Sequence, residues 1–356
     1  MTADAPLLSV CIPTFNQAEL LELCLATVLP QVAAFPDEVE CVISDNASTD
    51  RTFAILMESA ETFPLRIFRN DENIGIIANI TKCAAELARG EFILVIGDDD
   101  VLCIGAIDRI LKLLRTPDPP DLIALNVGFL PRSERPVASA AFGGVPATTE
   151  KTLRRSATSG VVRFEELFVG PCADFTASYS VVLRRRLWLK YFPQACRDEP
   201  FTSVRTTYPH AFVIANTMPG RPAGVIATPV VMVYEMPGNE FSWARYRALN
   251  SLIHLTSLLK MYQANGVPSQ VLKPYFIYQL DNRGSELGDL LWNRRSVGGL
   301  NRALELACML RRYPIRLLRM FLVALNHPDA PRWLAAVPRF LLQLKHFVLG
   351  AANKRR

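Results

Sequence analysis

Three consecutive carboxylates, Asp98–Asp100, follow Gly97 directly after the apolar run Phe92–Ile96. Such a run is typical of a strand buried on both faces, as in the middle of a parallel sheet. Three adjacent negative charges beside a dry strand repel one another, and a hard divalent cation among them would offset that repulsion. Open α/β sheets bind ligands at the carboxyl ends of their strands. We therefore predict a metal-bound nucleotide diphosphate here; the alternative is an acidic loop that caps the next helix, expected near Ile104.

The residues before this acidic run alternate between strand-like and helix-like patterns. Apolar residues between Leu20 and Leu29 recur at helical spacing, so the first helix has a buried face. Strands that alternate with helices through short connections predict a parallel sheet with right-handed crossovers. The predicted strands are Leu7–Ile12, Val39–Ser44, Leu65–Phe68 and Phe92–Ile96, and the later helices are Arg51–Ser59, Ile76–Ala88 and Ile104–Leu114.

A polar cluster follows each of these strands, at the end where parallel strands open onto a ligand site. The convergence of the clusters predicts one shared crevice, and Asn16 is also expected to cap the first helix. The sequence contains no G-x-G-x-x-G after the first strand and no Walker A motif, which argues against a Rossmann dehydrogenase or a P-loop enzyme. In chain order the clusters are Thr14 with Asn16, Asp45 with Asn46, Arg69 with Asn73, and Asp98–Asp100.

Four motifs surround these polar clusters. They are Ser-Val-Cys-Ile-Pro13-Thr14-Phe15-Asn16, Ile-Ser-Asp45-Asn46-Ala-Ser-Thr-Asp50, Asn73-Ile-Gly75, and Ala-Arg-Gly-Glu-Phe-Ile-Leu-Val-Ile-Gly-Asp98-Asp99-Asp100. In order and spacing, these motifs resemble those of family 2 glycosyltransferases of the GT-A fold. The Gly-Asp-Asp-Asp form of the last motif is similar to the abequosyltransferase-like subgroup. The resemblance implies an α/β GT-A fold with a mainly parallel central sheet.

The resemblance implies an inverting transfer from a nucleotide-sugar donor, usually with Mg²⁺ or Mn²⁺. In this family the first two loops hold the base and ribose, and Arg69 could add a contact to the diphosphate or could simply be a solvated arginine at a strand end. The residues expected to bind the donor are Pro13, Thr14, Asn16, Asp45, Asn46, Arg69, Asn73, Asp98 and Asp99.

The register of the acidic motif has two solutions. Asp98 and Asp100 form one D-x-D pair, whereas the Asp-Asp-Val-Leu ending favours Asp99 and Asp100. We assign the metal to Asp99 and Asp100. Independently of any family, a divalent ion that bridges two phosphates stabilises the charge that develops on a departing diphosphate.

An inverting enzyme needs a base within hydrogen-bond reach of the acceptor hydroxyl. Many family 2 members use an aspartate of a Glu-Asp pair for this step, and this chain lacks that pair in the corresponding region. Related Gly-Asp-Asp-Asp sequences carry Tyr-x-His, which matches Tyr208–His210, so the resemblance implies His210 as the base. His210 could instead complete the metal shell or pack on a helix. Asp198 is the second candidate for the base and Asp174 the third.

The domain organisation is expected to change near residue 240. Residues 1–240 would form the GT-A domain, with a nucleotide-sugar half at 1–130 and an acceptor half at 131–240, and the segment 236–243 would be a loop over the donor site. Residues 241–356 are expected to be helical, basic and amphipathic. From Arg311 onward the only acid is Asp329, and the apolar segment Trp333–Leu349 lies between basic residues. This pattern favours a membrane-surface element over a core-packing helix or a nucleic-acid-binding tail.

The pattern as a whole predicts a sugar transferase that works at the inner face of the cell membrane as a peripheral protein. Met1–Pro6 carries no basic residue, so no signal peptide is expected, and the eight cysteines show no zinc-ligand spacing, which favours buried thiols in the cytoplasm. The expected partners are a nucleotide-sugar donor, a glycan or lipid-linked glycan acceptor of surface polysaccharide synthesis, and the membrane surface, but no nucleic acid. Two alternatives are a nucleotidyltransferase and a non-catalytic sugar-nucleotide or glycan-binding protein.

Overall fold

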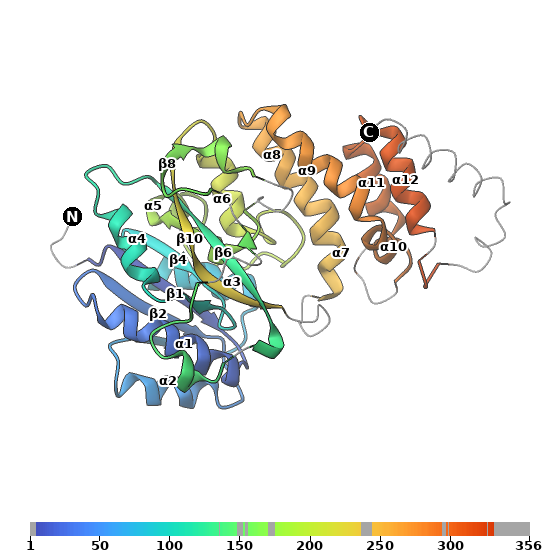
Figure 1. Ribbon diagram of the computed structural model, residues 1–356. Helices are drawn as coiled ribbons and strands as arrows, with labels where there is room; N and C mark the ends of the chain where they lie inside the picture. The colour runs from blue at the N-terminus through green and yellow to red at the C-terminus, as the bar shows by residue number, and fades with distance from the viewer. Residues whose placement is uncertain are drawn as a thin grey trace. The chain divides into compact units, whose positions relative to one another are not determined.

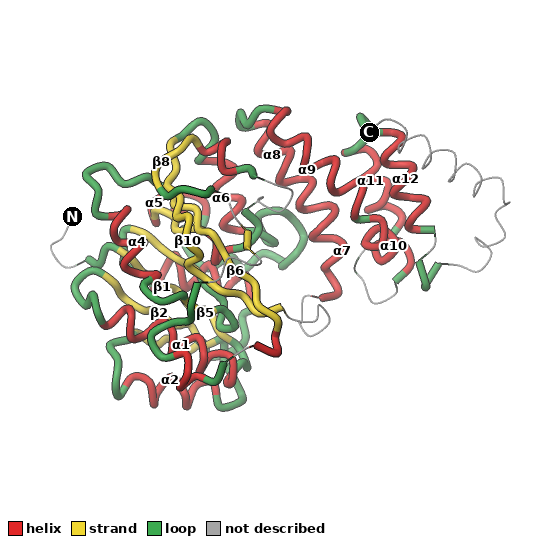
Figure 2. Tube along the Cα trace, viewed as in Figure 1, coloured by secondary structure: helices red, strands yellow, loops and turns green. Residues whose placement is uncertain are grey.

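The computed structural model describes residues 5–134, 136–147, 152–153, 156–169, 175–235, 244–293, 297, 299–325 and 327–330. The chain divides into two compact units, Met1–Met236 and Pro237–Arg356. Figure 1 labels their helices and strands, and Figure 2 colours the same trace by secondary structure. We describe each unit by itself.

The first unit is built on a mixed sheet, which runs in the order β3-β2-β1-β4-β9-β6-β10-β5, with β7 beside β6 and β8 beside β10. The strands β3, β2, β1 and β4 are parallel, as the sequence predicts, and β6 is parallel to β10. The strands are β1 (Leu8–Thr14), β2 (Val39–Asp45), β3 (Arg66–Arg69), β4 (Phe92–Val95), β5 (Val101–Leu102), β6 (Leu122–Pro131), β7 (Thr152–Leu153), β8 (Gly160–Arg163), β9 (Val181–Arg184) and β10 (Pro222–Glu235).

The surroundings of the acid-bearing strand differ from the prediction in one respect. β4 is fully buried, but it is parallel to β1 on one side and antiparallel to β9 on the other, so it lies where the parallel half of the sheet ends. β9 begins at Val181, directly after the short 3-10 turn Ser178–Ser180. The sheet is therefore α/β and mainly parallel in its paired residues, with antiparallel additions that the strand-helix alternation did not indicate.

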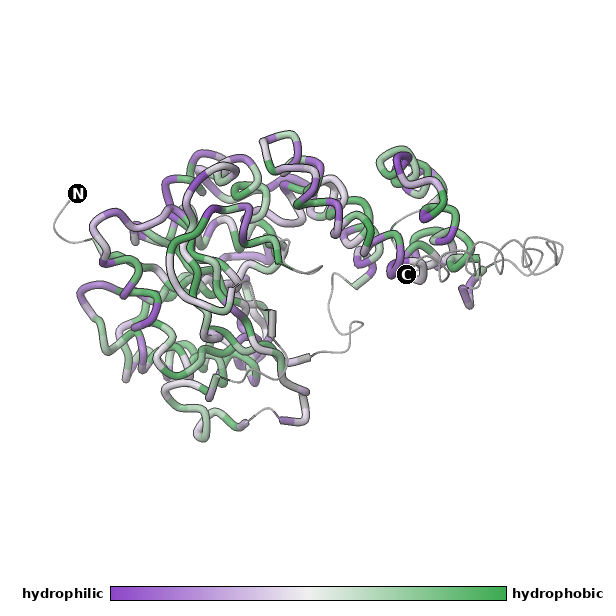
Figure 3. The backbone as a smooth tube through the Cα atoms, turned by 45° about the horizontal axis from the view of Figure 1, so that its top comes forward, coloured by the Kyte–Doolittle hydropathy of each residue, from purple (hydrophilic) through white to green (hydrophobic). Residues whose placement is uncertain are grey.

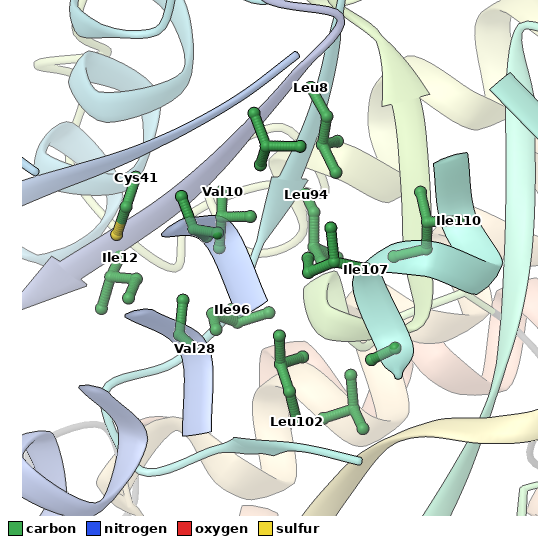
Figure 4. Close-up of a cluster of buried hydrophobic side chains, with 14 of the residues drawn as sticks. Leu8, Val10, Ile12, Val28, Cys41, Leu94, Ile96, Leu102, Ile107 and Ile110 are labelled. Carbon is green, nitrogen blue, oxygen red and sulfur yellow. The ribbon is translucent and has the colours of Figure 1, made fainter. Parts of the chain in front are cut away.

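Helices cover both faces of this sheet. Alternation along β1 directs Val10 and Ile12 into the main core with residues of α1 and α4, whereas the thiol of Cys11 lies near the carbonyl of Cys83 on the opposite face. Figure 4 shows side chains of the main core, including Val28 of α1 and Ile107 of α4. The helices are α1 (Ala18–Ala33), α2 (Thr52–Ala60), α3 (Ile76–Lys82), which continues as a π-helical segment (Cys83–Leu87), α4 (Ala106–Leu114), α5 (Arg185–Tyr191) and α6 (Pro209–Thr217).

The second unit is helical over its described residues. Between Ser269 and Trp292 the chain forms two helices, because Arg283 departs from helical geometry before Gly284. Figure 3 shows hydrophobic and hydrophilic stretches alternating along these helices. The helices are α7 (Arg247–Leu249), a π-helical segment (Asn250–His254), α8 (Leu255–Ala264), α9 (Ser269–Asn282), α10 (Gly284–Trp292), α11 (Leu300–Met309) and α12 (Pro314–Ala324).

None of the described helices is both long enough and apolar enough to cross a bilayer. The apolar segment Trp333–Leu349, the loop 236–243 and Asp174 lie outside the described residues. The predictions made for them remain predictions.

Candidate functional site

The loops that follow β1 and β2 are joined at the carboxyl edge of the sheet. The backbone N–H of Asn46 donates to the carbonyl of Thr14 at 2.9 Å. Two residues further along each loop, the N–H of Asn16 donates to the hydroxyl of Ser48 at 2.9 Å. The N–H of Thr49 donates to the side-chain oxygen of Asn16 at 2.7 Å. These bonds hold the two loops as one rigid rim, which confirms that the first two polar clusters converge.

Asn16 does not cap the first helix, contrary to the prediction. It has a φ of 52°, a left-handed conformation that asparagine tolerates, and its side chain points to the neighbouring loop. The exposed N–H groups at the start of α1 are instead satisfied from the second loop. Asp50 accepts from the N–H of Ala18 at 3.2 Å, and the hydroxyl of Thr52 accepts from the N–H of Gln17 at 3.1 Å. Because the partners lie more than thirty residues away, local capping rules could not find them.

Asn46 and Asn73 are occupied within a network of asparagines. The Asn46 amide oxygen accepts from Asn70 at 2.9 Å and from the N–H of Ile74 at 3.0 Å. Its amide nitrogen donates to Asn73 at 2.8 Å. Beneath them Asn70 donates to buried Asn79 at 3.1 Å. Asn46 and Asn73 therefore lie at the predicted edge of the sheet, where their contacts hold the loop after β3 against the loop after β2.

Asp45 and Arg69 also meet at this edge. Asp45 is completely buried, and its Oδ1 accepts from the N–H of Ser48 at 3.1 Å. Its Oδ2 lies 3.3 Å from Nε of Arg69 but has no hydrogen-bond partner among the described residues. Arg69 donates to the carbonyl of Ser48 and stacks over the ring of Phe53 at 4.4 Å. A buried carboxylate oxygen without a donor is unfavourable, so this oxygen is suited to accept an N–H group from a ligand.

Pro13 and Asp98 connect the first strand with the acidic run. Pro13 lies in β1 opposite Ser44. The hydroxyl of Thr14 donates to Oδ2 of Asp98 at 2.6 Å, and the N–H of Phe15 donates to the same oxygen at 3.4 Å. Burial and the neighbouring carboxylate raise the pKa of Asp98 to about 7 despite these bonds. Asp98 therefore fastens the strand-1 loop to the acidic run.

Asp99 and Asp100 bend back over Gly97. The N–H of Gly97 donates to Oδ2 of Asp100 at 2.8 Å. A Cβ atom at position 97 would lie 2.4 Å from Oδ1 of Asp99 and 3.1 Å from Oδ2 of Asp100, so the two carboxylates share the space that glycine leaves open. Burial raises the pKa of both groups, and the charge of Asp99 raises that of Asp100 further.

The alternative reading of the acidic run, as a helix cap, is wrong. α4 begins only at Ala106, after the short strand β5, and its N-terminal residue Gly105 makes no side-chain capping bond. The carboxylates instead face the Gly97 backbone and the first loop. The three adjacent carboxylates therefore do not stabilise the N-terminus of α4.

The acidic side chains at this site are suited to a divalent cation that needs only a few protein ligands. No group of three or more His, Cys, Asp or Glu side chains in the described part of the chain forms a ready-made metal cage. Mg²⁺ commonly takes only one or two carboxylates and completes its shell with water and phosphate oxygens. Asp99 and Asp100 provide two carboxylates around the space that Gly97 leaves, and their pKa values are raised mainly by burial, an effect that a bound cation would offset.

Two residues that sequence reasoning missed lie beside the acidic run. Tyr179, in the turn before β9, and Cys24, in α1, both have a raised pKa, mainly because of burial and then because of the charges of Asp99 and Asp100. The thiol of Cys24 also lies 3.7 Å from the carbonyl of Gly97. No sequence motif marks either residue, since Cys24 reads only as part of an apolar helix face.

His210 lies at the start of α6 and is 7% exposed. Burial lowers its pKa to about 4, although hydrogen bonding with the backbone of Thr176 and Phe175 partly opposes that effect. Its Nε2 has no hydrogen-bond partner among the described residues. The same short segment continues to Tyr179, so one stretch of chain contacts His210 and then approaches the acidic run.

Asp198 has different surroundings. Its side chain is 61% exposed and forms an ion pair with Arg205, whose guanidinium also stacks over Phe192. Nothing in the described contacts joins Asp198 to Asp98–Asp100. A base in an ion pair on the surface is poorly placed to take a proton in a closed site, so of the two described candidates His210 has the more suitable environment.

The sequence matches to known proteins include the residues at this edge of the sheet. Residues 9–134 match the family model described as Glycosyl transferase family 2. An uncharacterized protein of Mycobacterium tuberculosis is 35% identical over 127 residues, which cover 36% of this chain and 36% of that protein. Abequosyltransferase RfbV of Salmonella typhimurium is 38% identical over 98 residues, which cover 27% of this chain and 29% of the relative. The match spans about a third of each relative's own length.

Among solved structures, S. aureus TarS (residues 1–349) in complex with UDP has a TM-score of 0.54 at 15% identity, covering 96% of this chain and 87% of that chain. At this identity the likeness shows the fold alone: an α/β fold with a mixed, mostly parallel sheet, followed by helices. Over residues 9–134 the chain matches the model of glycosyl transferase family 2, and part of this region is distantly similar to an abequosyltransferase. Every donor-binding residue expected from the sequence lies within this matched region.

Proposed function

We propose that this protein is an inverting glycosyltransferase, which moves a sugar from a nucleotide-sugar donor to a glycan acceptor. The observation that carries the proposal is the direct bonding of three strand-end loops to one another. Thr14 binds both Asn46 and Asp98, so the ends of β1, β2 and β4 form one rim. Two further carboxylates stand at that rim over Gly97. Such a rim at the carboxyl edge of a sheet, in a region matched by the glycosyltransferase model, favours binding of an activated sugar.

The strand-2 end is the proposed binding place for the nucleotide base. Oδ2 of Asp45 is buried and lacks a donor, which suits an N–H group of a base. Nε of Arg69 lies 3.3 Å from this oxygen, and its guanidinium is near enough to the rim to offset phosphate charge. The UDP complex of TarS supports including uridine nucleotides in the first tests.

Asp99 and Asp100 are the proposed holders of Mg²⁺ or Mn²⁺. When bound, such a cation supplies positive charge that offsets the charge developing on the departing nucleoside diphosphate. Asp98 has a positioning task, because its bond with Thr14 fixes the first loop relative to the two carboxylates. Gly97 leaves the space in which they meet.

His210 is the proposed general base. With a pKa of about 4, its imidazole is neutral at physiological pH, so Nε2 has a lone pair available for the proton of the acceptor hydroxyl. As that proton moves to Nε2, the hydroxyl oxygen bonds to the anomeric carbon and the bond to the diphosphate oxygen breaks on the opposite face. This order of events inverts the sugar configuration. A metal-ligand role for His210 is the competing assignment.

The acceptor is proposed to be a lipid-linked glycan handled at the inner membrane surface, as in surface polysaccharide synthesis. Two features of the second unit support this choice. Arg311, Arg312 and Arg319 lie close together in the sequence, and exposed apolar side chains such as Ile315 and Leu304 occur on α12 and α11. Basic residues beside exposed apolar ones favour contact with an anionic leaflet.

The decisive experiment measures release of nucleoside diphosphate from a panel of UDP-, GDP-, CDP- and dTDP-sugars, with Mn²⁺ or with a chelator. We expect one donor class to be consumed only with the cation present. Asp100→Asn should abolish turnover, and Asp118→Asn, a change of an exposed acid in a loop, should not. Donor binding without any turnover, with or without acceptor extracts, would instead support the non-catalytic binder. Release of pyrophosphate from a nucleoside triphosphate would support a nucleotidyltransferase.

A further inference from the structure

The helical unit contains a cavity of about 670 Å³, and none of its lining residues belongs to the motifs assigned to donor binding or catalysis. It is bordered by α8, α9 and the turn between α11 and α12. Lys260 and Gln263 come from α8, Phe276 from α9, and Arg311 and Arg312 from the turn. All of these residues belong to the unit Pro237–Arg356.

The lining of this cavity is strongly basic. Lys260, Arg311 and Arg312 supply three positive charges. The one carboxylate in the lining, Glu305, is 2.8 Å from Arg302 and is thereby already paired. Within the described residues, no acidic side chain forms an ion pair with any of the three lining cations. The cavity therefore concentrates positive charge that the described protein groups do not neutralise.

The three cations are close enough to disturb one another. Partial burial lowers the pKa of Lys260, and the charges of Arg311 and Arg312 lower it further. Like charges that are held together in this way are unfavourable unless an anion is placed among them. Guanidinium groups offer paired N–H donors that match phosphate oxygens, and the lysine ammonium adds a compact charge.

The same lining also offers aromatic rings and a hydroxyl group. Phe276 is buried and stacks with Tyr313, with ring centroids 6.4 Å apart and an angle of 26° between the planes. The hydroxyl of Ser269 accepts from the amide of Gln263 at 2.7 Å at the same lining. A ligand that carries a phosphate at one end and an organic group at the other would find both positive charge and an apolar ring in this lining.

We propose that this cavity is a binding site for a phosphate monoester or diphosphate group. It lies apart in sequence from the donor-binding motifs and needs no divalent cation, so the proposal does not depend on the transfer reaction. The same chemistry would suit either a free organic phosphate or the headgroup of a phosphate-bearing lipid. The two sources differ in whether the protein is drawn to a vesicle.

The first test is calorimetric titration of the full chain with inorganic pyrophosphate, in the presence of a chelator so that no cation-dependent site contributes. We expect saturable binding that Lys260→Gln weakens at least about tenfold, because a charge-assisted bond to phosphate is lost. The double change Arg311→Gln with Arg312→Gln should weaken it further, and Arg312→Lys, which keeps the charge, should lose less. Lys273→Gln removes an exposed charge from α9 outside the cavity and is the matched control.

The second test identifies the source of the phosphate. Sedimentation is measured with phosphatidylcholine vesicles that contain or lack phosphatidic acid. If Lys260→Gln loses both pyrophosphate binding and the sedimentation that depends on phosphatidic acid, the phosphate ligand is a lipid headgroup. Unchanged sedimentation with loss of pyrophosphate binding identifies a free phosphate. The proposal is overturned if the unmodified chain does not bind pyrophosphate, or if Lys273→Gln weakens binding as much as Lys260→Gln does. Circular dichroism of each variant confirms that the chain remains folded.

Discussion

The two units each concentrate charge of one sign, but they hold it in different ways. In the first unit Asp98–Asp100 are consecutive and largely removed from water, and short bonds join Asp98 to Thr14 and Asp100 to Gly97. In the second unit Lys260 comes from one helix and Arg311 and Arg312 from a distant turn, and both arginines are exposed.

This difference matches the geometry that each kind of ligand requires. A divalent cation needs oxygen atoms held at fixed positions, which a tight backbone turn can provide. A phosphate accepts donors from many directions, so long side chains on separate helices can gather around it. The acidic cluster is therefore a rigid site and the basic cluster an adaptable one, and the following changes test this contrast from the largest expected effect to the smallest.

Asp100→Asn should produce the largest loss. The amide can still accept the N–H of Gly97, so the local fold remains, but the charge that would hold a cation is removed. Turnover should fall at least about a thousandfold, in line with the loss of a major electrostatic contribution. Because the substitution relieves buried repulsion, thermal stability in chelator should not decrease. Pyrophosphate binding in chelator should be unchanged; a parallel loss would mean that the two clusters are not independent.

His210→Gln should reduce turnover about a hundredfold or more, the usual contribution of a positioned general base. Donor affinity, measured by titration with a non-hydrolysable donor analogue, should remain within about twofold of the original, since a base acts after the donor has bound. Asp198→Asn is the comparison, and its turnover should be close to normal. If Asp198→Asn is the inactive variant and His210→Gln is active, the base has been assigned to the wrong residue.

Gly97→Ala tests the shared space above the acidic turn. A methyl group there would meet Oδ1 of Asp99 at 2.4 Å, and the carboxylate would have to rotate away. Since the displaced atom is the end of a side chain, the free energy of unfolding should change by less than about 1 kcal/mol. Mn²⁺ affinity, measured by electron paramagnetic resonance, should fall about tenfold. Unaltered Mn²⁺ affinity would show that the cation is held elsewhere.

Among the described residues, each unit also contains one buried histidine, and the titration of these two histidines should give the smallest and most gradual effect. Burial lowers the pKa of both His210 and His254 to about 4, below the value near 6.5 expected in the unfolded chain. The unfolded state therefore binds more protons between these values, and stability is present above pH 6.5 and is lost as the pH falls toward 4. Each histidine contributes at most about 1.4 kcal/mol per pH unit in that interval.

The measurement for this last effect is urea unfolding at several pH values between 7.5 and 4.5, on the unmodified chain and on His254→Gln, with the slope of stability against pH as the readout. His254 contacts Asn250, so absolute stability will change, but the slope is specific to titration. In His254→Gln the free energy of unfolding should fall less steeply as the pH decreases. An identical slope in both proteins would mean that His254 does not titrate between those limits.

Much of the first unit could be predicted because its signals are local. The apolar run before Gly97 specifies a buried strand, and Asp45, Asn46 and Asp98 follow their strands directly, so parallel order alone brings them to one edge. The antiparallel strand β9 could not be predicted in this way. It joins the sheet beside β4 from a distant part of the chain, and no pattern within β4 indicates which neighbour pairs with it.

The sequence by itself determined the strand-helix alternation, the place of the acidic run and the family to which residues 9–134 are similar. It did so because these features depend on residue type and short spacing. Only the tertiary structure decided that Asp98 is bound to Thr14, that Asn16 serves the second loop, that Tyr179 approaches the carboxylates and that Lys260 meets Arg311 and Arg312 around one cavity. Those juxtapositions join residues far apart along the chain, and they arise from packing that local patterns do not encode.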